Sequence, residues 1–228
     1  LRLYETISII ILYIVLGGQT LTAQQKMYMD DKEPVLSIMV KPRETIRYTL
    51  QHKKFSYSLY VGAIGGFASA LITLYGTPYQ YKYSLGEMVY SSFITGVLYY
   101  LLINLILAAL LSVIGSVFKG KSNVKTLFQT LCLTSIPYIW LMPIVLFWMQ
   151  LAPQTFFEVK NIAWEMTDYL IAYVGSFFIL VASIWVFVLT IIGVSVVHQI
   201  SKWKSFFILL LASIMSSIVL GMFLIFFM

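Results

Sequence analysis

Long stretches without a charged side chain constrain this chain more than any other feature. Five such runs follow residue 54, and each exceeds the roughly 20 residues that a helix needs to cross a bilayer. They cover residues 55–75, 88–118, 126–152, 169–197 and 205–228. Backbone polar groups find no water in the bilayer core, so such runs must be helical. We therefore predict an all-α polytopic integral membrane protein in which residues 55–228 form a bundle of five transmembrane helices.

The composition agrees with this class of protein. Hydrophobic residues make up 60% of the 228 residues, charged residues make up 11%, and the mean hydropathy is +0.89. Soluble domains contain about 25% charged residues. The formal net charge of +6 would suit a nucleic-acid-binding protein, but the basic residues flank apolar runs, which is typical of membrane topology. We expect a protein of the lipid bilayer that binds no nucleic acid.

A basic segment precedes the first apolar run. Residues 41–54 read KPRETIRYTLQHKK and contain five Lys or Arg residues. Pro42 suits the first turn of a helix, and Ile46 and Leu50 fall four positions apart on one face. This pattern predicts a short amphipathic helix at the cytoplasmic surface, within a lead of residues 29–54. The alternative is a basic flank that only sets the topology.

Loop charges predict the orientation. With a cytoplasmic N-terminal segment, residues 26–54, 119–125 and 201–204 place twelve basic residues on the cytoplasmic side, whereas Lys82 and Lys160 lie outside. Positively charged loops stay cytoplasmic, so we predict a cytoplasmic N-terminus and an external C-terminus. The apolar core of residues 1–28 is short for a span. We interpret residues 1–28 as a leader or upstream extension, with a sixth span as the alternative.

Small residues recur every four positions on three of the runs. This spacing places them on one helix face and lets two backbones approach closely. We predict packing within one bundle, with homo-oligomerisation through the face of Gly62 and Gly66 as the alternative. The candidate packing residues are Gly62, Gly66 and Ala70 on the first run, Asn104, Ala108 and Ser112 on the second, and Ser213, Ser217 and Gly221 on the fifth.

The third run contains two prolines, Pro137 and Pro143. Each removes a backbone hydrogen bond, so we predict a kinked or broken helix. Broken helices can build substrate sites in transporters. A small permease or channel subunit, organised around this break and Asn104, is therefore our alternative function. No charged residue lies deep within any of the five runs, which argues against an ion pump or a proton-coupled transporter.

Catalytic and metal-binding patterns do not occur in the sequence. HExxH, GxSxG and a phosphate-binding loop are absent, and Cys132 is the single cysteine. His198, at the end of the fourth run, is more typical of an interfacial residue than of a base or metal ligand. We expect no catalytic site, no metal and no cofactor, and so a protein that is not an enzyme.

Three short elements resemble the bacterial members of the YIP family (Ypt/Rab-interacting proteins). KPRETIR at residues 41–47 resembles the Pro-Arg-x-Thr element before the first span, and Ser135, Pro137 and Tyr138 resemble a Ser-x-Pro-Tyr element. The stretch from Trp185 to His198, followed by a basic break, is similar to the penultimate span of the family. The resemblance covers roughly residues 36–228 and implies five helices with a cytoplasmic N-terminus.

What the resemblance implies is a non-enzymatic protein that binds other membrane proteins. Eukaryotic members act with small GTPases and vesicle coats through long soluble N-terminal regions. This chain has only the short lead of residues 29–54 before its first apolar run, which does not favour GTPase binding. Some bacterial members are linked to ABC-type export systems as accessory or assembly components. We therefore predict a scaffold or accessory factor of the bacterial plasma membrane with membrane proteins, such as transporter subunits, as partners. The candidate partner or membrane-surface contacts are Lys41, Pro42, Arg43, Glu44, Thr45 and Arg47.

Overall fold

The described part of the chain is helical throughout. The computed structural model describes residues 34–157 and 165–227, with side chains as far as residue 218. All regular elements in these ranges are helices, as the sequence predicts. In chain order they are α3 (Pro34–Ser37), α4 (Pro42–His52), α5 (Phe55–Thr73), the 3₁₀ turn η1 (Tyr79–Tyr81), α6 (Leu85–Val117), α7 (Val124–Thr134), α8 (Ile136–Leu151), α9 (Pro153–Phe156), α10 (Met166–His198) and α11 (Lys202–Phe227).

Four apolar segments in the described ranges are long enough to cross a membrane. They are α5, α6, the α7–α8 pair over Val124–Leu151, and α10. These segments coincide with the first four runs of the sequence, so the class of polytopic helical membrane protein is confirmed. The fifth run forms α11, a helix in its own right, and its crossing of the membrane stays a prediction.

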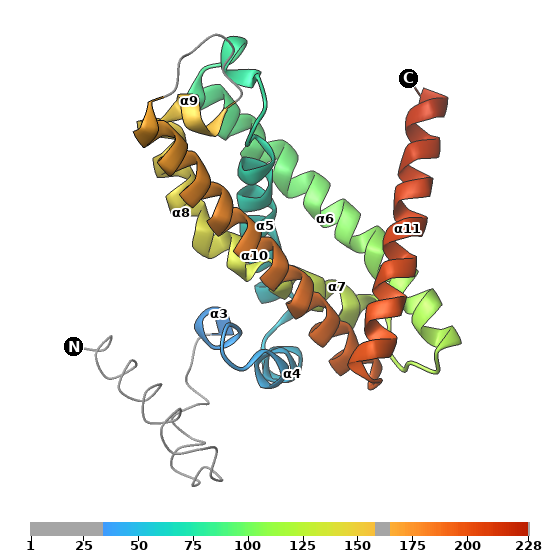
Figure 1. The fold of residues 1–228 in the computed structure, drawn as a ribbon. Coiled ribbons are helices and arrows are strands. Elements are labelled where there is room, and N and C mark those ends of the chain that lie inside the picture. Colours follow the sequence, from blue (N-terminus) through green and yellow to red (C-terminus); the bar gives the residue numbers. More distant parts are fainter. Residues whose placement is uncertain (1–33, 158–164, 228) are drawn as a thin grey trace, which may run out of the picture.

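The helices form a bundle that is open on one side (Figure 1). α5 packs against α6, α7 and α8, and α10 packs against α7, α8 and α4. α11 contacts the ends of α6 and α10 at the lower end of the view and diverges from them toward its own C-terminal end. Chain segments far apart in sequence therefore share one core, in which Ala108 of α6, Val194 of α10 and Ala212 of α11 are buried together.

The third span is broken in its middle. α7 ends at Thr134 and α8 begins at Ile136, with Ser135 between them. Pro137 takes one of the first two positions of α8, where its missing N–H costs little, and Pro143 lies inside α8. Ser135 Oγ donates a hydrogen bond of 2.7 Å to the carbonyl of Cys132. The last four carbonyls of a helix have no N–H partner within that helix, and this bond satisfies one of those at the end of α7.

Glycines of α5 allow the bundle to close around this break. A methyl group added at Gly62 would overlap the Cys132 side chain, and one added at Gly65 would overlap Ser135. On the α6 side, a methyl group at Gly66 would collide with Tyr100. The face that carries Gly62 and Gly66 is therefore buried inside the chain.

Candidate functional site

Helix α4 carries most of the candidate contact residues. Pro42 begins the helix, and Thr45, Ile46 and Thr49 are buried, whereas Arg43 and Arg47 are exposed. The Thr45 hydroxyl donates to the carbonyl of Lys41 at 2.8 Å, so a buried polar group is satisfied within its own turn. This division of faces is the one predicted from the spacing of Ile46 and Leu50.

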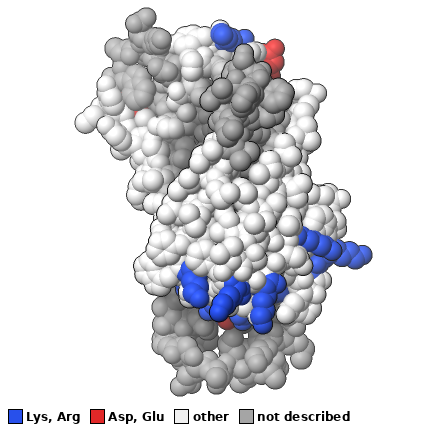
Figure 2. Space-filling view, turned by 90° about the vertical axis from the view of Figure 1, so that its right-hand side faces the viewer, with Lys and Arg blue, Asp and Glu red and all other residues white. Residues whose placement is uncertain are grey.

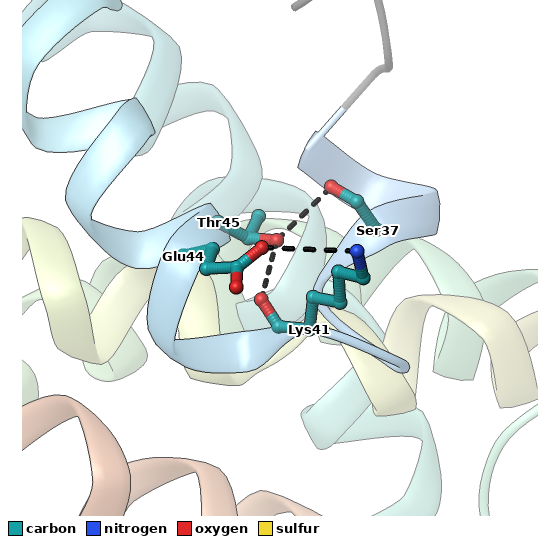
Figure 3. A network of polar contacts seen from close by, with 4 residues as sticks. All are labelled: Ser37, Lys41, Glu44 and Thr45. Atoms are coloured by element: carbon teal, nitrogen blue, oxygen red, sulfur yellow. Dashed lines mark hydrogen bonds and ion pairs between the residues drawn. The ribbon is translucent and has the colours of Figure 1, made fainter. Parts of the chain in front are cut away.

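A small polar network fixes the start of α4 (Figure 3). Thr45 Oγ1 lies 3.1 Å from Ser37 Oγ, which ties α4 to α3. Lys41 Nζ lies 3.9 Å from Glu44 Oε2 across one turn. This ion pair is at the surface, with Glu44 70% exposed, and contributes less than about 1 kcal/mol. The KPRET segment thus orients the helix, and Arg43 stays at the surface.

The apolar face of α4 packs on the bundle. Ile46 has no exposed surface and lies in one buried cluster with Leu133 of α7 and Leu189 and Val196 of α10. Gly193 of α10 lets α7 approach, because a methyl group there would overlap Thr130, and Ile46 Cδ1 would lie 3.6 Å from that methyl group, an ordinary contact distance. The amphipathic helix is therefore docked on its own protein through the face that could otherwise enter lipid.

Basic residues gather at one end of the bundle (Figure 2). Of the eleven Lys and Arg residues in the described ranges, only Lys82 lies at the end opposite α4. That opposite end also carries three described acids, Glu87, Glu165 and Asp168. The basic end consists of Lys41, Arg43, Arg47, Lys53, Lys54, Lys119, Lys121, Lys125, Lys202 and Lys204.

Two turns with left-handed residues bring the basic loops together. Lys119 (φ 63°) follows α6, and Gln199 (φ 58°) caps α10. The backbone N–H of Lys121 then donates to the carbonyl of His198 at 3.3 Å. The His198 ring, at the end of α10, is buried against Gly115 and Gly120. Two glycines, distant from it in sequence, leave the space that the ring fills.

Polar side chains also meet at the break in the third span. Tyr100 of α6 lies beside Asn104 and Ser135. Tyr138 Oη donates to Ser183 Oγ of α10 at 3.3 Å. The Ser-x-Pro-Tyr element thus forms the break and joins it to its neighbours.

A second hydrogen bond to α10 joins two threonines that the sequence pattern does not predict to be in contact. Thr190 Oγ1 lies 3.3 Å from Thr134 Oγ1, and both residues are buried. The two threonines lie on different helices, and no local spacing relates them. Only the packing of α7 against α10 brings them together.

The structure brings some of the candidate packing residues together and leaves others apart. Gly66 and Ala70 of α5 face Gly96 of α6, and Ala108 is fully buried with the start of α11. Ser213 and Ser217 are exposed, because α11 meets α6 through Ile208 and Ala212 instead. Ser112 is half-buried, and Gly221 lies beyond the described side chains.

Comparison with known families identifies the fold. The family profile described as the Yip1 domain matches residues 36–225, which is most of the chain. The chain belongs to the Yip1 domain family. The match begins within α3 and ends within the last turn of α11, so it includes the whole of every element from α4 to α10. No curated protein matches the chain. No solved structure matches it either.

Membership in the Yip1 family confirms the family to which the sequence elements point. The family consists of membrane proteins that interact with other membrane proteins, and this fits a non-enzymatic accessory role at the membrane.

Proposed function

We propose that this Yip1-domain protein is a non-enzymatic scaffold or assembly factor that binds other membrane proteins in a bacterial plasma membrane. The partner class that we favour is an ABC-type export system, as the resemblance to bacterial members of the family implies. The observation that supports this proposal is the docked helix α4, which presents Arg43 and Arg47 on the exposed side of the basic end.

The rigidity of α4 makes it suitable for partner recognition. Its buried face is held by Ile46 and its start is fixed by Thr45 and Ser37, so Arg43 and Arg47 need no ordering of the helix before they bind. Preorganised groups lose less entropy on association. A partner with acidic residues near its cytoplasmic surface would complement this charge, which favours fast and selective encounter.

The test is capture of membrane partners by the tagged full-length protein. The wild-type protein, solubilised in a mild detergent, should retain a stoichiometric membrane complex, identified by mass spectrometry. The double variant Arg43→Glu and Arg47→Glu should retain at least about tenfold less of it, because attraction to acidic groups becomes repulsion. Arg43→Lys with Arg47→Lys is the matched control and should keep most of the partner.

Two results would contradict the scaffold. One is unchanged capture by the glutamate variant. The other is a wild-type protein that is recovered alone, as a monomer or homo-oligomer, and that moves a small uncharged solute in reconstituted vesicles. The second result would favour the permease or channel subunit, organised around Ser135, Pro137 and Asn104.

A further inference from the structure

A pocket of about 500 Å³ opens at the basic end of the molecule. Three parts of the chain form its walls: the exposed side of α4, the turn between α6 and α7, and the C-terminal end of α10. Its volume lies in the range typical of small-molecule sites. The lining residues are Arg47, Leu50, Gln51, Lys121, Ser122, Asn123, Thr126, Val196, Val197 and Gln199.

The charges of this pocket favour an anion. Arg47 and Lys121 contribute two cations from different elements, and none of the described residues that line the pocket is acidic. Within the described ranges neither cation forms an ion pair with a carboxylate. A bound anion would therefore relieve the repulsion between two like charges that share one pocket.

Neutral hydrogen-bonding groups surround the two cations. Gln51, Asn123 and Gln199 supply side-chain amides, and Ser122 and Thr126 supply hydroxyls. Asn123 and Thr126 are linked at the start of α7, where Asn123 Oδ1 accepts from the Thr126 N–H at 2.9 Å. The Ser122 and Thr126 hydroxyls donate to the Asn123 carbonyl at 3.3 and 3.1 Å, so they shape the turn. The guanidinium, the ammonium and the side-chain amides are the groups that match the oxygens of a phosphate group.

The position of the pocket points to a lipid headgroup. α10 ends at His198 and α7 begins at Val124, so the pocket lies at the ends of two apolar segments, where headgroups occur in a bilayer. Leu50, Val196 and Val197 give it an apolar wall beside the polar one. We propose that this pocket binds an anionic phosphate group, as carried by the headgroup of an anionic membrane lipid.

The test compares two double variants of the full-length protein. Arg47→Gln with Lys121→Gln removes both cations of the pocket. Lys119→Gln with Lys202→Gln removes the same net charge from exposed positions of the basic end that do not line it. Each protein is titrated in neutral detergent with phosphatidylglycerol or phosphatidylcholine, and the bound lipid is counted by native mass spectrometry. Inorganic phosphate is titrated separately by calorimetry at constant ionic strength, to distinguish a lipid from a soluble source.

We expect the wild-type protein to bind phosphatidylglycerol more tightly than phosphatidylcholine, whose choline cation meets two positive side chains. The pocket variant should bind phosphatidylglycerol about tenfold more weakly, because hydrogen bonds to two charged groups are lost. The control variant should stay within about twofold of wild type, since general attraction to distant charges is screened. Saturable binding of inorganic phosphate with the same dependence on Arg47 and Lys121 would support the pocket with a soluble phosphate as its ligand.

The proposal is overturned if neither probe binds more tightly than phosphatidylcholine. It is also overturned if both double variants lose binding equally, since general surface charge would then explain the preference. Melting temperatures equal to wild type show that both variants are folded, as expected for exposed positions. The pocket shares Arg47 with the proposed partner contact, so Arg43→Glu alone separates the two roles: it tests partner capture without touching a residue that lines the pocket.

Discussion

At the scale of single residues, the absence of a side chain decides how closely the helices of this bundle approach. Gly65 faces Ser135 at the break between α7 and α8, and Gly62 faces Cys132 one turn away. Lipid gives no hydrophobic drive for helix association, so close packing and hydrogen bonds must supply it. Ser135 is fully buried and its hydroxyl is used by the Cys132 carbonyl, so it has little room to move.

Gly65→Ala should therefore destabilise the protein. The added methyl group would overlap Ser135, and overpacking of this kind costs about 1–3 kcal/mol. Thermal unfolding in mild detergent should show a clearly lower midpoint. Gly86→Ala is the matched control, because no atom lies within 4 Å of the added methyl group. Equal midpoints for the two variants would contradict the close packing at Gly65.

At the scale of elements, α4 shows how an amphipathic helix can serve its own protein. Its sequence pattern is compatible with a helix in the lipid interface, a helix on the bundle or a flexible basic flank. The structure places Ile46 in a cluster with residues of α7 and α10, and Trp140 Nε1 of α8 donates to the Val35 carbonyl at 3.3 Å. These contacts hold the segment of α3 and α4 across the end of the bundle.

Ile46→Ala should loosen α4 more than it loosens the rest of the protein. Loss of a buried isoleucine side chain costs about 2–5 kcal/mol, and the loss falls on the contacts that dock this helix. Limited digestion with chymotrypsin should cut earlier at Tyr48 or Leu50, because local opening exposes those bonds. Arg43→Ala, at an exposed position of the same helix, should digest like the wild-type protein. Identical digestion of the two variants would show that Ile46 does not hold α4 in place.

At the scale of the whole molecule, charge separates the two ends of the bundle. Basic residues from α4, the turn before α7 and the start of α11 gather at one end, and Glu87, Glu165 and Asp168 lie at the other. Segments that are far apart in sequence thus gather ten basic residues at one end, with Glu44 as the one described acid among them. Positive loops are retained in the cytoplasm, so this separation predicts that the basic end faces the cytoplasm.

Cysteine labelling should place the two ends on opposite sides. We expect Lys121→Cys to react with a membrane-impermeant maleimide only from the cytoplasmic side, and Lys82→Cys only from the outside. The wild-type protein is the control, because Cys132, its only cysteine, is buried and should stay unlabelled in intact membranes. A tag after Met228 should be accessible from the outside if α11 crosses the membrane. Labelling of both variants from the same side would refute the topology.

The sequence by itself determined the helical segments of this protein. Hydropathy is a local property, so the apolar runs marked α5, α6, the α7–α8 pair, α10 and α11 to within a few residues. The main differences also have a local cause. α6 begins at Leu85 and α10 at Met166, three residues before the predicted runs, because Ser84 with Glu87 and Glu165 with Asp168 form capping boxes. Glu87 and Asp168 interrupt the uncharged runs, yet each lies in the first turn of its helix.

Only the tertiary structure decided which faces meet. The spacing of Gly62 and Gly66 suits packing within one chain or between two, and the structure buries this face against α6 and α7. In the folded protein His198 is buried, and Thr134 is hydrogen-bonded to Thr190. Arg47, Lys121 and Gln199 line one pocket. These residues lie on segments that no local periodicity relates. Their contacts depend on how the helices pack in three dimensions, which the order of residues within one helix does not specify.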